Sequence, residues 1–353
     1  MAEFLALGIT HYPMLAGVDD QMASLLRWTL KDPDIPDSAK DPTTWSENMQ
    51  REWGDDEGRA AAAGHRAELR AGLRRCREAL DEFQPDVVIV WGDDQYENFR
   101  EEVIPPFCIL AYDDLQLPAF EVVRDMGIAN AWGMDKDAKL TLHGAPAEAR
   151  ELTTGLIEEG VDMAYSYKPR ERSHFPHAIL NTQLFLDYDN AGQEMNYPFV
   201  PMTVNCYGHH VIARKGGLAR YAAIEKEVWD PAGPTPKRCF EVGAATARVL
   251  RKTDLRVALV ASSSWSHAFL CDDRWHLDPD HAADRRLYDL MVSGDYDTMN
   301  ELTTSEVVKS GQQEILNWYA MLGAVDELGL KLDWSTMVTT DVFNSNKPFA
   351  IFS

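Results

Sequence analysis

The chain has 353 residues, of which 45% are hydrophobic and 26% are charged, a composition typical of a globular protein. Its net charge of −23 would repel phosphate backbones and anionic lipids, so we expect neither nucleic acid nor a membrane as a partner. Five cysteines without a Cys-x-x-Cys pair, and no apolar stretch near the ~20 residues of a membrane span, favour a reduced, cytoplasmic protein.

Apolar runs and helical spacing predict the elements of the chain. Strands are expected over residues 4–10, 87–90, 107–112, 162–167, 199–205 and 256–264. Helices are expected over residues 59–83, 147–160, 236–251 after Thr235 as N-cap, 282–293 and 305–328. Residues 32–56 lack a clear period and are expected to form a long surface excursion, and residues 113–147 are expected to be irregular.

The order of these elements predicts the fold class. A strand, a long connection with a helix and a second strand favour a parallel pair, and this order recurs. We expect an α/β protein with a central, mostly parallel mixed sheet flanked by helices. No internal repeat or linker interrupts the chain, so residues 1–353 are expected to form one domain.

Polar residues follow four of the predicted strands directly. They are His11; Asp93, Asp94 and Gln95; His209 and His210; and a serine run followed by His267. In an open α/β sheet, ligands and catalytic groups gather beyond the carboxyl ends of the strands. Imidazoles and carboxylates that converge there suit a non-haem Fe(II) site or a zinc site. The chain carries no His-Glu-x-x-His, Walker A, Gly-x-Gly-x-x-Gly or Gly-x-Ser-x-Gly motif, which excludes the enzyme classes that those motifs mark.

Several passages, in the same order, resemble the class III extradiol dioxygenases, the group of the protocatechuate 4,5-dioxygenase β-subunit. They are Thr10-His11-Tyr12-Pro13, GDDQYENFREEVIPPFC from residue 92, FVPMTVN from residue 199 with GPTPKRCFEVGAATARVL from residue 233, SSSWSHAF from residue 262, and SGQQEILNWYAMLGAV from residue 310. The resemblance covers most of the chain and implies a ring-opening oxygenase.

The resemblance implies His11 as the first metal ligand, and it leaves the other ligands open. Gln95 stands where the family has its second ligand, a histidine, and a neutral amide is a weaker ligand for Fe(II). Three alternatives follow for the second ligand. Gln95 binds the metal weakly; Asp93, Asp94 or another histidine takes its place as ligand; or the site no longer binds a metal. The third ligand is His267 in one branch of the family.

In the other branch a carboxylate supplies the third ligand, and Asp272 or Asp273 lies near that point of the chain. The resemblance also places the catalytic base at His209 or His210, with His210 preferred, and gives His177 an acid or supporting function. Further along the chain, His276 and His281 are expected in a solvated acidic loop.

The implied function is Fe(II)-dependent extradiol cleavage of a catecholic or aminophenolic ring with O2, with zinc or manganese as other metals to consider. Tyr12, Trp28, Trp45 and Trp53 are candidates for an aromatic wall around the substrate. Two rival functions differ in class: a metal-dependent hydrolase or decarboxylase on the same scaffold, and a non-catalytic homologue whose site has lapsed at Gln95. A homo-oligomer is expected, and the need for a partner subunit stays open.

Overall fold

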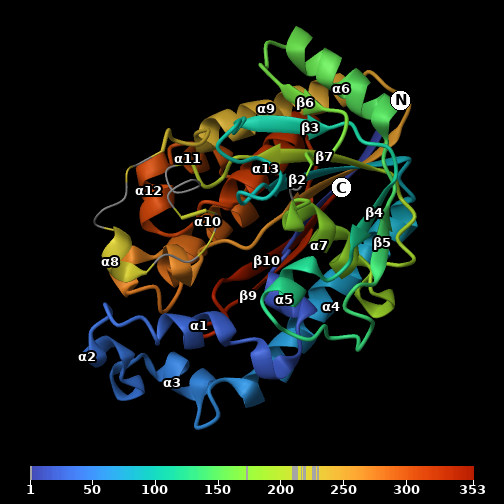
Figure 1. Ribbon diagram of the computed structural model, residues 1–353. Helices are drawn as coiled ribbons and strands as arrows, with labels where there is room; N and C mark the ends of the chain where they lie inside the picture. The colour runs from blue at the N-terminus through green and yellow to red at the C-terminus, as the bar shows by residue number, and fades with distance from the viewer. Residues whose placement is uncertain are drawn as a thin grey trace.

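An eight-stranded mixed sheet forms the centre of the protein, with the strands in the order β6-β3-β7-β2-β8-β1-β10-β9 (Figure 1). The computed structural model describes residues 2–171, 174–208, 214–215, 217, 220–224, 228 and 230–353. The sheet strands are β1 (Glu3–Ile9), β2 (Val87–Asp93), β3 (Phe107–Leu110), β6 (Ala164–Ser166), β7 (Phe199–Val204), β8 (Arg256–Ser262), β9 (Leu332–Val338) and β10 (Lys347–Phe352). The pairs β1–β8, β8–β2, β2–β7 and β3–β6 are parallel, and the pairs β7–β3, β1–β10 and β10–β9 are antiparallel. The predicted α/β class with a mostly parallel mixed sheet is confirmed.

Helices cover both faces of this sheet. They are α1 (Ser24–Thr29), α2 (Asp37–Lys40), α3 (Glu47–Trp53), α4 (Arg59–Phe83), α5 (Glu121–Asp125), α6 (Pro146–Glu158), α7 (His177–Leu186), α8 (Tyr221–Ile224), α9 (Pro236–Leu250), α10 (His281–Ser293), α11 (Tyr296–Met299), α12 (Thr304–Lys309) and α13 (Ile315–Leu328). A separate two-stranded ribbon pairs β4 (Leu115–Pro118) with β5 (Lys139–Leu142).

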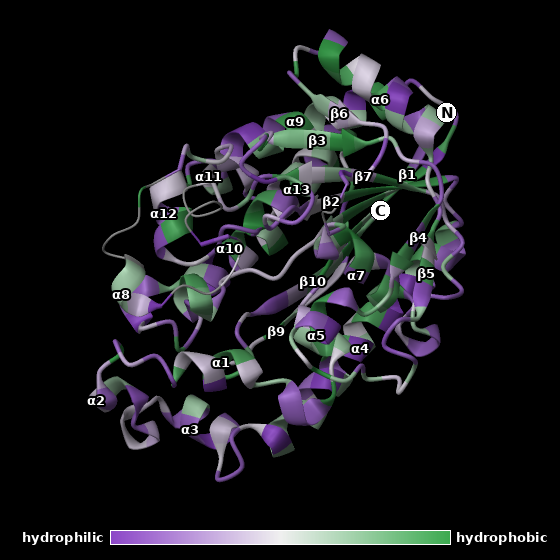
Figure 2. Ribbon diagram, viewed as in Figure 1, coloured by the Kyte–Doolittle hydropathy of each residue, from purple (hydrophilic) through white to green (hydrophobic). Residues whose placement is uncertain are grey.

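The central strands read as continuous apolar runs because both of their faces are buried. Val88 and Val90 of β2 belong to the core beneath α4 and α7, whereas Val87, Ile89 and Trp91 belong to the core beneath α9 and α13. In Figure 2 the sheet strands are mostly green, and hydrophilic purple predominates around α2 and α3.

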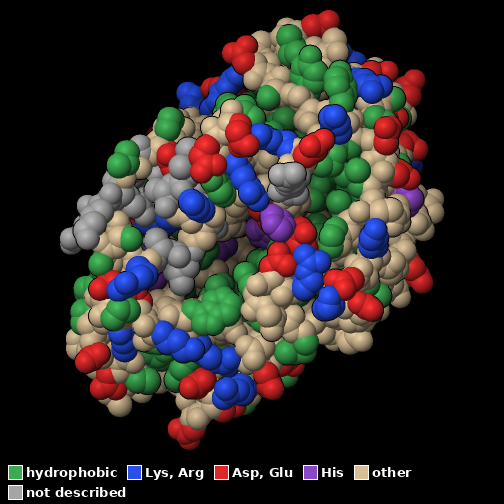
Figure 3. Space-filling view, viewed as in Figure 1, with side chains coloured by type: hydrophobic (Ala, Val, Ile, Leu, Met, Phe, Trp, Pro, Cys, Tyr) green, Lys and Arg blue, Asp and Glu red, His purple; other side chains and the backbone are tan. Residues whose placement is uncertain are grey.

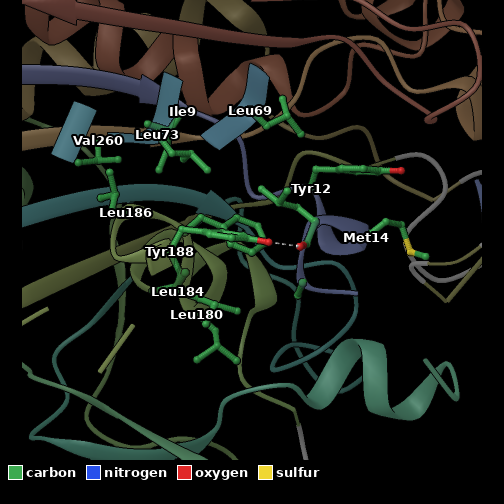
Figure 4. Packing of buried hydrophobic residues seen from close by; sticks show 14 of the residues in the cluster. Ile9, Tyr12, Met14, Leu69, Leu73, Leu180, Leu184, Leu186, Tyr188 and Val260 are labelled. Atoms are coloured by element: carbon green, nitrogen blue, oxygen red, sulfur yellow. Dashed lines mark hydrogen bonds between the residues drawn. The ribbon is translucent and has the colours of Figure 1, made fainter. Parts of the chain in front are cut away.

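Figure 4 shows how the first of these cores is assembled from segments far apart in the sequence. Labelled side chains from two strands and two helices lie together there: Ile9, Val260, Leu69, Leu73, Leu184 and Leu186. This packing fixes β1 against α4 and α7, and therefore fixes the residue that follows β1.

On the other face, α9 and α13 approach each other closely at two glycines. A β-carbon built on Gly243 would lie 1.7 Å from the carbonyl oxygen of Ala320, and one on Gly323 would lie 2.0 Å from that of Phe240. Any larger residue would push the helices apart. The contact therefore fixes the position of α13 and of the chain just before it.

Most of the predicted elements are present within a few residues of their expected bounds, including the Thr235 N-cap, whose hydroxyl accepts from the Arg238 amide. Two predictions were wrong. The expected helix over residues 305–328 is two helices, α12 and α13, separated by residues 310–314. Residues 113–147, expected to be irregular, contain β4, α5 and β5. Residues 32–56 form the expected surface excursion and are mostly exposed, with the short helices α2 and α3 inside it. The elements β9, β10 and α7 were not predicted.

None of the helices in the described part of the chain combines the length and the apolar character needed to cross a bilayer. The division of the chain into domains stays a prediction.

Candidate metal centre and active site

The four strands that end in polar residues run parallel and in register, so their carboxyl ends meet at one edge of the sheet. Ile9 of β1 pairs with Ser262 of β8, and Asp93 of β2 pairs with Val204 of β7. A cavity of about 210 Å³ opens beyond this edge. In Figure 3 the visible face is hollowed near its centre, and purple histidine side chains show at the wall of the hollow.

The polar wall of the cavity brings together residues from every third of the chain. It comprises His11, Gln95, Glu97, His177, His267 and Glu314. Ser264, Tyr12, Asn344 and several apolar side chains complete it.

His11 is buried and held in one orientation. Its Nδ1 atom lies 2.7 Å from the carbonyl oxygen of Ser262, and Asn181 donates to the carbonyl of His11 at 3.0 Å. A carbonyl can only accept, so Nδ1 carries the proton and Nε2 presents its lone pair. Burial lowers the pKa of His11 well below its ordinary value, and the neighbouring His177 lowers it further. A neutral, oriented imidazole is the form that binds a metal ion.

Two buried carboxylates face this lone pair. The Nε2 atom of His11 lies 3.6 Å from Oδ1 of Asp93, at the end of β2, and 3.3 Å from Oε2 of Glu314, just before α13. The ligand atoms of the three residues all lie within 4.8 Å of one another. Asp93 Oδ2 and Glu314 Oε2 have no hydrogen-bond partner among the described residues.

The electrostatics of this group favour a cation. Burial raises the pKa of Asp93 to about 6, and burial together with the nearby Asp93 raises that of Glu314 well above its ordinary value. Two carboxylates in a dry site cannot both carry charge cheaply unless a positive charge lies between them. A divalent ion would meet that need, and the donor set of one imidazole and two carboxylates fits iron, manganese or zinc.

Further side chains orient the carboxylates. The Tyr207 hydroxyl donates to Oε1 of Glu314, and Nδ2 of Asn317 donates to Oδ1 of Asp93 at 3.5 Å. His267 places its Nε2 atom 3.3 Å from Glu314 Oε1, and burial lowers the pKa of His267 to about 3. His267 is therefore neutral and lies against the same carboxylate as His11.

His177 forms a second unit with Glu97. Its Nδ1 atom lies 2.9 Å from Oε1 of Glu97, and its backbone amide donates to Oε2 at 3.1 Å. Burial alone would lower the pKa of His177, but Glu97, together with Asp93 and Glu314, outweighs burial and raises the pKa to about 9. The ring stands edge-on to His11 with the centroids 4.9 Å apart. His177 thus holds a proton beside the carboxylate group at neutral pH.

Several residues singled out from the sequence line this cavity, and one does not. His11, Gln95, His177 and His267 lie in the wall. The carboxylate of Asp272 instead contacts Nε2 of His276 at 2.8 Å and Arg214 at 3.3 Å. His209 and His210, expected to supply the base, lie outside the described residues.

Asp94 and Asp273, two further acidic candidates for the metal, have other surroundings. Asp94 accepts from the backbone amides of Glu97, Asn98 and Phe99, so it organises the loop after β2. Asp273 is exposed, 4.0 Å from Lys309.

Two expectations concern side chains outside the metal group. The solvated loop expected around His276 is wrong, because that side chain is buried. Of the four residues expected in an aromatic wall, Tyr12 lines the cavity, whereas Trp45 and Trp53 pack against each other.

Glu314 was missed because it was assigned to the interior of one long helix. The signal lay in Ser310-Gly311-Gln312-Gln313, a polar stretch with a glycine that precedes an apolar run. Gly311 adopts a φ of 66°, where a side chain would be strained, and a β-carbon there would also lie 2.7 Å from the sulfur of Cys271. The helix cannot continue through this point, and the break presents Glu314 to the sheet edge.

Comparison with known proteins agrees with this geometry. Residues 227–351 match the family model of the catalytic LigB subunit of aromatic ring-opening dioxygenase. The chain is 27% identical over 198 residues to a 2,3-dihydroxyphenylpropionate/2,3-dihydroxicinnamic acid 1,2-dioxygenase of Rhodococcus jostii (strain RHA1). The matched region covers 56% of this chain and 48% of that protein. It is 24% identical to a protein of the same description from Burkholderia vietnamiensis, over 74% of this chain and 82% of that protein.

The chain thus spans about half the length of the Rhodococcus relative, and the match to the Burkholderia relative extends over most of both chains. The matched segment 227–351 contains His267 and Glu314, and the buried His11, Asp93 and Glu314 provide a group able to hold a metal. Residues 227–351 are therefore similar to the catalytic subunit of the LigB family of aromatic ring-opening dioxygenases.

Proposed function

We propose that the protein is an extradiol-type dioxygenase that opens the ring of a catecholic or aminophenolic substrate with O2 at an Fe(II) centre. The observation that carries the proposal is the oriented, neutral His11, which lines the cavity and faces buried oxygens of Asp93 and Glu314. The cavity of about 210 Å³ exceeds the roughly 150 Å³ of an engineered cavity that holds benzene.

His11, Asp93 and Glu314 would hold the metal, with His267 beside Glu314 as a further predicted ligand. A bound Fe(II) would supply the open positions at which the two adjacent substrate oxygens and O2 meet, together with the electron transfer between them. Gln95 lines the same wall and stays the weaker candidate beside Asp93.

The chain's own residues would manage protons and water. His177 holds its Nδ1 proton toward Glu97, so its Nε2 proton is the one available to an oxygen of the substrate or product. A base must also take a proton from the substrate hydroxyl, and His210 stays the prediction for that step. Burial of the polar wall keeps bulk water from the reacting atoms.

The test is oxygen uptake. Protein reconstituted anaerobically with Fe(II) is mixed with a panel of catechols and 2-aminophenols, and O2 consumption is followed together with the absorbance of the ring-opened products. We expect one mole of O2 consumed per mole of ring opened. Turnover without O2 consumption would favour a hydrolase or decarboxylase, and failure to retain metal would favour a lapsed site.

A further inference from the structure

The cavity is lined by apolar side chains as well as polar ones, and the apolar ones indicate which substituent the substrate ring carries. Leu25 of α1, Val122 and Met126 of the α5 segment, and Phe269 also line the cavity. A ring whose two oxygens face His11 and Glu314 would therefore direct its substituent toward aliphatic and aromatic side chains.

The charges of the wall point the same way. Among the lining residues that the structure describes, Glu97 and Glu314 are acidic and none is lysine or arginine. The Nδ1 atom of His177 already contacts Oε1 of Glu97 at 2.9 Å. A carboxylate on the substrate would thus leave water for a wall in which none of the described lining residues is a lysine or arginine.

Three arginines of the described chain pair with carboxylates outside the cavity lining. Arg214 pairs with Asp272, Arg220 with Asp34 and Arg170 with Glu102. The net charge of −23 adds long-range repulsion of anions. The Rhodococcus and Burkholderia relatives are named for dihydroxyphenylpropionate, a carboxylate, so the wall of this cavity suggests a different preference.

We propose that the substrate is a diol or aminophenol whose ring substituent is uncharged and apolar, and that the cavity discriminates against carboxylated rings. This inference rests on the proposed function for its chemistry, but it can be tested by binding alone. The matched probes are 3-(2,3-dihydroxyphenyl)propionate and its methyl ester, which share a ring and differ in charge.

Binding is measured first, by calorimetry on the Fe(II)-loaded protein without O2. We expect the ester to bind at least about tenfold more tightly than the acid, since the acid would bury an unpaired carboxylate. Equal or tighter binding of the acid would overturn the inference. Ring opening is measured second, and a bound ester that is never opened would count against the proposed function while leaving this preference standing.

A charge variant provides the second arm. Met126 lies at the cavity with 36% of its surface exposed, so the head group of Met126→Arg can stay hydrated while it reaches a substrate carboxylate. We expect Met126→Arg to shift the binding ratio toward the acid by about tenfold. Ile157→Arg adds the same charge on exposed α6, away from α5 in Figure 1, and should leave the ratio unchanged. An unchanged ratio in Met126→Arg would contradict an apolar substituent site at α5.

Discussion

The Nε2 atom of His11 lies 3.3 Å from Oε2 of Glu314, although one residue follows the first strand and the other precedes the last long helix. His11 presents the lone pair of Nε2 toward Glu314, and Oε2 of Glu314 has no hydrogen-bond partner in the described chain. A cation between them would bind both atoms and would allow the buried carboxylates to ionise together.

Glu314→Gln should separate metal binding from folding. The amide is a poor ligand, so Fe(II) affinity should fall by at least the roughly 10- to 100-fold typical of losing a supporting partner. The metal-free variant should melt at the same temperature as the metal-free wild type or higher, because an amide avoids the cost of burying an ionisable carboxyl beside Asp93. Calorimetric metal titration and thermal melts measure both effects.

Glu301→Gln is the matched control, because Glu301 is exposed on the turn before α12. It should change neither metal affinity nor the melting temperature of the metal-free protein. A Glu314→Gln variant that retained full affinity would remove Glu314 from the centre.

Asp93 and Gln95 can be distinguished as the replacement for the missing histidine. Asp93→Asn should lower Fe(II) affinity strongly, whereas Gln95→Leu should lower it little, since an amide oxygen contributes weakly. Gln95→His in the Asp93→Asn background should restore affinity by supplying imidazole. Metal titration of the three variants provides the comparison, and the reverse order of the single variants would assign the ligand to Gln95.

The sheet and part of the site followed from the sequence for one physical reason. Strands buried on both faces read as unbroken apolar runs, and parallel strands deliver the next residue to one edge, so His11 and Asp93 could be placed together. Glu314 could not be placed at this edge from the sequence, because helical spacing continues on both sides of residues 310–314 and does not show that the helix is interrupted there. Asp272 was chosen for its distance along the chain from His267, and spacing does not show that a side chain pairs with its own neighbour His276.

The C-terminal strands were hidden by their composition. β10 begins with Lys347 and Pro348, residues that favour a surface or an edge. In the fold Lys347 is fully buried, with its Nζ atom donating to the carbonyl of Phe343 and lying 3.9 Å from the ring centroid of Tyr12. Only the tertiary partners reveal that such a lysine belongs to the interior.

Glu97→Gln should change the protonation of His177. In the metal-free wild type, pairing holds the pKa of His177 at about 9, so the stability it contributes is present below about pH 6.5 and is lost as pH rises through about 9. Without the Glu97 carboxylate the pKa of His177 should fall, because burial lowers it and only Asp93 and Glu314 still raise it. Histidine NMR titration of the metal-free protein measures the midpoint. The control is Glu82→Gln, on the exposed face of α4, which should leave the His177 midpoint unchanged. An unchanged midpoint in Glu97→Gln would show that the His177–Glu97 contact does not set this pKa.

The close approach of α9 and α13 should make Gly243 sensitive to a single methyl group. Gly243→Ala would place a β-carbon 1.7 Å from the Ala320 carbonyl, so the helices must separate, at a cost of about 1–3 kcal/mol or more. Gly64→Ala in α4 has open space within 4 Å and should stabilise by about 0.5–1 kcal/mol through helix propensity. Urea unfolding compares them. Equal stability of the two variants would contradict the tight contact that positions Glu314.

Asp284 in α10 predicts a pH dependence of stability that is separate from the metal group. Its carboxylate is buried and accepts from the Ser266 amide, Gln312 and Asn346, yet burial outweighs these bonds and raises its pKa to about 6. Because the pKa of Asp284 is higher in the folded state, the folded protein prefers the protonated carboxyl. The stability that Asp284 contributes is therefore present below about pH 4 and is lost as pH rises through about 6.

The wild type should therefore lose roughly 2–3 kcal/mol of unfolding free energy between pH 4 and 7 relative to Asp284→Asn, which cannot ionise. The variant also replaces an acceptor by an amide, so its absolute stability can be lower, and the slope with pH is the informative quantity. Asp289→Asn, exposed on the same helix, should keep the wild-type slope. Urea unfolding of metal-free protein at several pH values measures the slopes, and parallel curves for wild type and Asp284→Asn would show that Asp284 stays ionised in the fold.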